Sequence, residues 1–178
     1  MASHFLATRS NLFRSPDGSV VNNSAVIFTE VDNTKPFTFT AKVQPEFTET
    51  GTYSAGVIYA YENDTHCQKL CFEQDEYGDH RVVSVRTLGT SDDNNHQAIT
   101  APYVYMRLSS DGTTLGSYFS EDGKIWRMAR LYKNDFPEKL LIGISSQSPK
   151  DNEHTCLFTE VSLTDKPVAD FRKGNIAE

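Results

Sequence analysis

Residues 103–119 read YVYMRLSSDGTTLGSYF, two strand-like runs joined by Asp111-Gly112. In the first run Val104, Met106 and Leu108 alternate with other side chains, a period of two that is typical of a β-strand with one buried face. Aspartate followed by glycine favours the tight turn of a β-hairpin, because glycine accepts the positive φ that such turns require. The stretch therefore predicts an antiparallel hairpin that packs one face against a hydrophobic core.

The same pattern recurs on both sides of this hairpin, and no stretch has a convincing helical period. About ten strand-like runs, separated by turn-forming pairs such as Asp122-Gly123, predict an all-β antiparallel sandwich or barrel. In the run 81–87, Val83 and Val85 are expected to face the core, with Ser84 and Arg86 outside. The polar segment Leu88 to Ala101 is predicted to be a long loop, and the polar tail from about residue 164 to pack lightly.

Length and composition predict one globular domain over residues 1–178. The formal net charge of −7 argues against nucleic acid as a partner, because a phosphate backbone requires an excess of basic residues. The sequence contains no apolar run of the ~20 residues that span a bilayer, and its first ten residues do not resemble a secretion signal. Together with an odd number of cysteines, Cys67, Cys71 and Cys156, these features predict a cytoplasmic protein with reduced thiols.

A set of short motifs follows the hairpin and precedes it in a fixed order. The motifs are Tyr53 to Ile58, Lys69 with Glu73, Ser84 to Thr87, Arg107-Leu108, Gly116 to Phe119, Ser120-Glu121-Asp122-Gly123 with Trp126, Leu141 to Ile144, Gln147-Ser148-Pro149 and Phe158 to Val161. In this order they resemble the concanavalin A-like lectin/glucanase domain of the uncharacterised family named after a yeast regulator of enolase. The resemblance implies a jelly-roll of two curved antiparallel sheets, in which the concave outer face of one sheet is the usual ligand face.

Alternation along the strands then predicts which polar residues share that face. If Leu70 and Phe72 belong to the core, Lys69 and Glu73 point outward. The same rule extends the predicted ligand-binding site to six residues: Lys69, Glu73, Arg86, Tyr105, Arg107 and Gln147. Lysine and arginine recognise anionic groups, a carboxylate accepts hydroxyl hydrogens and a tyrosine ring offers a stacking surface. Because three of the six are cationic, the groove is expected to be locally basic.

From the sequence we predict no catalytic residues, no metal site and no cofactor. Glycoside hydrolysis requires two facing carboxyls, and Glu73 with Asp75 and Glu76 only weakly matches a glucanase strand motif. The histidines and cysteines lack the close spacing of a zinc site. The run Asp92-Asp93-Asn94-Asn95 is interpreted as a polar turn, although its oxygen atoms are also of the kind that bind calcium.

The function predicted on these grounds is that of a non-enzymatic binding or regulatory protein. Its expected partner is a small polar or anionic ligand or a protein loop, and the family name suggests a link to glycolytic metabolism through enolase. Three alternatives stay open: a lectin-like carbohydrate-binding module, an enzyme acting on glycosides, and a structural protein that dimerises through a sheet edge or face. Cys67 and Asp93 stand where the family pattern has tryptophans, which counts against the lectin alternative.

Overall fold

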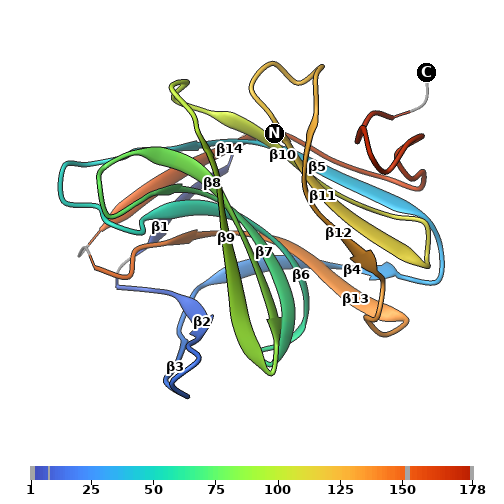
Figure 1. Cartoon of the computed structure of the whole chain (residues 1–178), viewed down its shortest axis with the longest axis horizontal. Coiled ribbons are helices and arrows are strands. Elements are labelled where there is room, and N and C mark those ends of the chain that lie inside the picture. Colours follow the sequence, from blue (N-terminus) through green and yellow to red (C-terminus); the bar gives the residue numbers. More distant parts are fainter. Residues whose placement is uncertain (1–2, 8, 151–152, 177–178) are drawn as a thin grey trace.

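The structure is a computed structural model that describes residues 3–7, 9–150 and 153–176, and this part of the chain contains strands but no helix (Figure 1). The strands are β1 (Ser3–Ala7), β2 (Leu12–Arg14), β3 (Val20–Asn22), β4 (Val26–Asp32), β5 (Phe37–Pro45), β6 (Ala55–Asn63), β7 (His66–Gln74), β8 (His80–Leu88), β9 (Thr90–Ala98), β10 (Val104–Ser110), β11 (Thr114–Ser120), β12 (Arg127–Lys133), β13 (Lys139–Gln147) and β14 (His154–Thr164).

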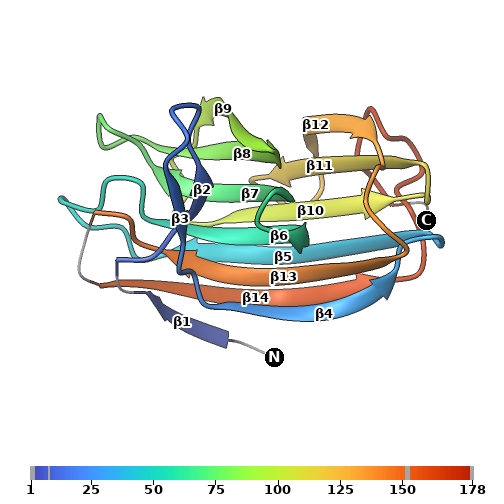
Figure 2. The ribbon, with the colours of Figure 1, turned by 90° about the horizontal axis from the view of Figure 1, so that it is seen from below.

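Two six-stranded antiparallel sheets form the sandwich. One, the β7 sheet, has the order β4-β13-β6-β7-β8-β9, and the other, the β10 sheet, has the order β1-β14-β5-β10-β11-β12. The hairpin predicted from residues 103–119 is the β10–β11 pair, in which Met106 lies opposite Phe119. A separate two-stranded ribbon, β2–β3, lies outside both sheets (Figures 1 and 2). The predicted antiparallel sandwich of two sheets is confirmed.

The core lies between the two sheets because each strand sends alternate side chains inward. Phe37, Phe39 and Val43 of β5 pack in one cluster with Leu70 and Phe72 of β7, and all five are buried. This interface explains why the short-period alternation in the sequence predicts the fold class, since burial of one face per strand provides the main driving force.

Gly56 lies at a place where the two sheets approach closely. A Cβ atom at this position would clash with the Cys156 Sγ and Val43 Cγ1 atoms of the opposite sheet. Gly56→Ala is therefore expected to lower the free energy of unfolding by about 1–3 kcal/mol, as overpacking of a core does. Urea denaturation measures the effect, and the double variant Gly56→Ala/Cys156→Ala should recover part of it. A Gly56→Ala protein as stable as the wild type would contradict the close approach.

Two segments differ from the sequence-based prediction. Most of the expected loop Leu88 to Ala101 is strand β9, which pairs with β8 at the edge of the β7 sheet. Its polar side chains reflect that edge position, because an edge strand is exposed and is protected from further pairing by charged and polar residues. The tail also packs closely: the Thr38 hydroxyl donates to Lys166 O at 2.6 Å and Val168 N donates to the Ser109 hydroxyl at 2.9 Å.

Strand β8 has the opposite orientation to the one predicted. Val85 lies opposite Lys69 and therefore points to the outer face of the β7 sheet, whereas Ser84 lies opposite Leu70 and points inward. The inward-pointing Ser84 has a polar partner, because Arg130 Nε donates to its hydroxyl at 3.4 Å. The outward valines are buried because the β2–β3 ribbon adds a second hydrophobic cluster on that face.

Candidate functional site

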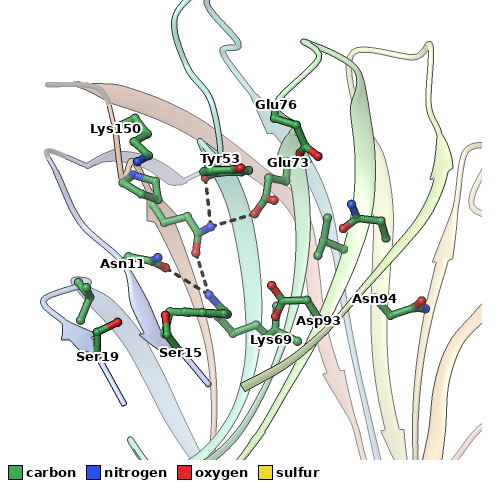
Figure 3. A pocket seen from close by; sticks show the side chains of 17 residues that line it. Asn11, Ser15, Ser19, Tyr53, Lys69, Glu73, Glu76, Asp93, Asn94 and Lys150 are labelled. Atoms are coloured by element: carbon green, nitrogen blue, oxygen red, sulfur yellow. Dashed lines mark hydrogen bonds between the residues drawn. The ribbon is translucent and has the colours of Figure 1, made fainter. Parts of the chain in front are cut away.

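A pocket with a volume of ≈ 790 Å³ lies on the outer face of the β7 sheet (Figure 3). Strands β7, β8 and β9 form its floor, and the β2–β3 ribbon forms one wall. This size is within the range of pockets that bind small organic molecules.

The β2–β3 ribbon is fixed in place by one apolar anchor and several hydrogen bonds. Leu12 is 3% exposed and packs against the cluster that contains Tyr59 and Val85. At the far end of β2, Arg14 N donates to the Ser91 hydroxyl at 3.0 Å and its Nε donates to Gly89 O at 2.9 Å. The wall of the pocket is therefore attached to the same strands that form the floor.

A row of three polar side chains crosses the floor. Lys69 Nζ donates to Gln147 Oε1 at 3.2 Å, and Gln147 Nε2 donates to Glu73 Oε2 at 3.1 Å. Lys69 Nζ also donates to Asn11 Oδ1 at 3.3 Å, and Gln147 Nε2 donates to Tyr53 O at 3.2 Å. Lysine is a donor only, so its contact fixes the orientation of the Gln147 amide group.

The surroundings change the acidity of two carboxyls in the pocket. Burial raises the pKa of Glu73 to about 8, although the nearby Lys69 ammonium opposes the shift. Desolvation also raises the pKa of Asp93, and the charge of Lys69 again acts in the opposite direction. Glu73 is therefore mostly protonated at neutral pH, which makes it a hydrogen-bond donor rather than a second charge.

Tyr53 lines the same pocket with a strained backbone. Its φ of 65° lies in the left-handed region, which side chains larger than glycine seldom adopt. Its amide donates to Gln74 O at 2.7 Å, and its own carbonyl accepts from Gln147. Strained residues held by such contacts often occur at binding sites.

The structure brings together three of the six predicted site residues and separates the others. Lys69, Glu73 and Gln147 share the pocket. Arg86 does not, because it faces the other side of β8, where its Nη2 lies 2.5 Å from Asp135 Oδ2 and its guanidinium stacks over Tyr132. The prediction that Arg86 lines the cleft is wrong, for the reason given above for the orientation of β8.

Tyr105 and Arg107 also lie outside the pocket, on the outer face of the β10 sheet. Alternation correctly directs both side chains outward, but their strand belongs to the other layer of the sandwich. The Tyr105 hydroxyl donates to Glu160 Oε1 at 3.2 Å, and the Arg107 guanidinium stacks on Trp126 at 3.6 Å. The expected basic groove is therefore wrong: the pocket contains Lys69 and Lys150 against Glu73, Glu76 and Asp93.

Sequence reasoning missed the pocket residues Asn11, Phe13, Tyr53 and Asp93. Asn11 and Phe13 belong to the ribbon, for which the local pattern gives no indication of where it docks. Asp93 lies opposite Val85 in the β8–β9 pair, so the recognition of β9 as a strand would place it in this pocket.

The acidic segments considered for catalysis and metal binding have other contacts. Asp75 forms an ion pair with Arg81 at 2.5 Å and accepts from the amides of Tyr77 and Asp79, which organises the turn after β7. Within the run 92–95, Asp92 pairs with Arg130 at 3.2 Å, whereas Asp93 lines the pocket. Among the described residues, no group of three or more histidine, cysteine or acidic side chains is placed to hold a metal ion.

The sequence profile of the family described as "Protein of unknown function (DUF1349)" matches residues 5–166. The chain belongs to the DUF1349 family. Among curated proteins, none matches this DUF1349 chain. A crystal structure of a functionally unknown protein from Saccharomyces cerevisiae is similar over 92% of this chain and 88% of its own, with 22% identity and a TM-score of 0.82. The jelly-roll-like fold expected from the resemblance is confirmed, and the family shown is DUF1349, whereas the naming after a regulator of enolase is not confirmed.

Two larger proteins contain a domain similar to this DUF1349 chain. The GH43 protein BlXynB from Bacillus licheniformis matches with a TM-score of 0.70 and 13% identity, over 91% of this chain and 32% of its own. A xylan beta-1,4-xylosidase from Bacillus halodurans C-125 matches with a TM-score of 0.67 and 13% identity, over 90% of this chain and 32% of its own. The chain thus spans about a third of each of these proteins, and the likeness concerns the fold. In the part of the chain that the structure describes, no helix is long and apolar enough to cross a membrane.

Proposed function

We propose that this protein binds a hydroxylated, sugar-like small molecule in the pocket of the β7 sheet, without converting it chemically. The observation that carries the proposal is the row of Lys69, Gln147 and Glu73, which are held in fixed positions on the floor of a ≈ 790 Å³ pocket. Side chains that are already oriented bind a polar ligand with little further loss of entropy.

The pocket combines polar groups with apolar surface in the way that sugar recognition requires. Phe13, Val83 and Val85 line it beside the polar row. Sugars present hydroxyls on their edges and C–H groups on their faces, so a mixed lining of this kind can contact both. The similarity in fold to part of a xylan beta-1,4-xylosidase supports the same ligand class.

The proposal also includes the cytoplasmic location and the regulatory role that the sequence suggested. Cys67, Cys71 and Cys156 are free and buried, which supports a reducing compartment. The link to glycolytic metabolism rests on the family resemblance alone. We therefore include sugar phosphates and glycolytic intermediates among the ligands to be tested.

Calorimetric titration with neutral sugars, sugar acids and sugar phosphates tests the proposal. At least one compound is expected to bind the wild type, and Lys69→Met should weaken that binding roughly ten- to hundredfold, the effect of losing a hydrogen bond to a charged group. Lys42→Met is the matched control, because Lys42 lies on the outer face of the β10 sheet, over the Tyr103 ring.

Binding that Lys69→Met leaves unchanged would place the ligand elsewhere and contradict the proposal. If no compound binds, a protein loop becomes the better candidate for the pocket, and the small-molecule function is rejected. Circular dichroism melting of both variants shows whether each is folded, so that a loss of binding is not confused with a loss of structure.

A further inference from the structure

The Lys69 ammonium is an almost fully buried charge whose hydrogen-bond partners are neutral. The residue is 2% exposed, and in the described part of the chain its acceptors are the amide oxygens of Asn11 and Gln147. None of the ion pairs between described residues includes it. A buried ammonium is costly unless a negative charge or several hydrogen bonds compensate it. An ammonium has three N–H groups, and these two contacts use only two of them.

Glu73 provides a second donor on the same floor. Its Oε2 atom accepts from Gln147 Nε2, so the proton of the neutral acid is carried by Oε1. Burial keeps this carboxyl protonated at neutral pH, because its pKa is raised to about 8. The floor therefore presents an N–H of Lys69 and an O–H of Glu73, with the Gln147 amide between them.

We propose that the ligand of this pocket is a sugar acid, such as a uronic or aldonic acid, whose carboxylate is bound by Lys69 and Glu73. The inference rests on the proposed function and specifies its ligand class. A carboxylate has two oxygens that accept hydrogen bonds and a single negative charge, and it would provide the charged hydrogen-bond acceptor that Lys69 lacks, because the nearby Asp93 interacts with Lys69 through its charge alone. The hydroxyls of the sugar acid would face the outer part of the pocket.

Charges around the outer part of the pocket favour a single negative charge on the ligand. Lys150 lines the pocket together with Glu76 and Asp93, both of which are exposed. With Glu73 neutral, the two lysines of the pocket balance these two carboxylates. One carboxylate can enter without large repulsion, whereas a doubly charged phosphate would meet Asp93 and Glu76. The same two acids can accept hydrogen bonds from sugar hydroxyls.

Binding is then expected to depend on the protonation of Glu73. The charged groups around this carboxyl are Lys69 on its own strand, Asp75 and Glu76 in the following turn, Asp93 on β9, Arg81 on β8 and Lys150 after β13. When Glu73 ionises, the O–H donor is lost and a negative charge faces the bound carboxylate. Sugar acids themselves remain ionised from pH 6.5 to 9, since an ordinary carboxyl has a pKa of about 4.

The test is calorimetric titration with glucuronate, gluconate, glucose, xylose and glucose 6-phosphate at pH 6.5 and pH 9. At pH 6.5, glucuronate or gluconate should bind at least tenfold more tightly than the neutral sugars and the phosphate. At pH 9 the affinity for this sugar acid should fall by about tenfold. Lys69→Met should remove the preference for the acid, and Lys42→Met should preserve it.

Glu73→Gln separates protonation from the general effects of pH. The amide oxygen of this variant can accept from Gln147 and its NH₂ group can donate to the ligand at both pH values. It should therefore bind the sugar acid at pH 6.5 and show no loss at pH 9. An unchanged pH dependence in Glu73→Gln would overturn the role of Glu73.

The outcomes also distinguish this inference from the proposed function. If neutral sugars bind as tightly as sugar acids, and Lys69→Met weakens the binding of both, the proposed function stands and the sugar-acid inference is wrong. Tighter binding of glucose 6-phosphate would likewise overturn the inference. If none of the five compounds binds, both are rejected.

Discussion

Glu73→Gln is expected to increase the free energy of unfolding at pH 8 by about 2–4 kcal/mol relative to the wild type. The pKa of Glu73 is raised by burial to about 8, whereas in the unfolded chain it returns to its usual value of 4.5. Between these values the unfolded state has released the proton and the folded state retains it. The contribution of Glu73 to the free energy of unfolding therefore falls as the pH rises from 4.5 to 8, and it then levels off.

The full shift would correspond to about 5 kcal/mol, and we expect less because the side chain is partly exposed to the pocket. Glutamine keeps the acceptor for Gln147 but has no proton to lose, so the variant should lack this fall in stability. Urea denaturation of both proteins at pH 4.5, 6 and 8 measures the difference, which should widen with pH.

Glu49→Gln is the control for this series, because it removes one carboxylate from an exposed position away from the pocket. It should show the pH profile of the wild type. A difference between Glu73→Gln and the wild type that stays constant from pH 4.5 to 8 would show that Glu73 ionises normally in the folded protein. The pH-dependent recognition of a sugar acid would then lose its basis as well.

The all-β fold could be predicted from sequence because alternation and turn residues report directly on local geometry. Val104, Met106 and Leu108 face the core as their spacing indicates. The same rule failed for Val83 and Val85, since a strand buried on its outer face by another element has the same pattern as one buried in the core. The element that covers them, the β2–β3 ribbon, is distant in sequence and has no local signal for its docking position.

The candidate site could be predicted only in part, and the missing information is topological. Alternation gives the direction of Tyr105 and Arg107 relative to their strand, but it does not say to which sheet the strand belongs. The pairing of β10 with β5 and β11 places both residues on the far layer, away from Lys69. Asp93 was missed for a related reason, because a polar edge strand resembles a loop in sequence.

Arg107→Met is expected to lower the free energy of unfolding by about 2–4 kcal/mol, because this arginine binds the C-terminal segment to the β10 sheet through hydrogen bonds. The residue is 6% exposed, its Nη1 donates to Gly174 O at 2.6 Å, and its Nε donates to the Thr40 hydroxyl at 3.0 Å. Burial lowers the pKa of Arg107 to about 10, so the group remains charged at neutral pH. Each of these hydrogen bonds therefore has a charged donor, and the guanidinium also stacks on Trp126.

Urea denaturation measures this loss, and Arg107→Lys should recover only part of it. A lysine lacks the planar fork that donates to Thr40 and Gly174 while it stacks on Trp126. Arg127→Met, on the exposed edge strand β12, is the matched control and should change stability by less than about 0.5 kcal/mol. Ligand binding in the pocket of the β7 sheet should persist in folded Arg107→Met. If instead the variant keeps its stability and loses the ligand, Arg107 belongs to the binding site as the sequence suggested, and the pocket assigned to Lys69 and Glu73 is not the whole of it.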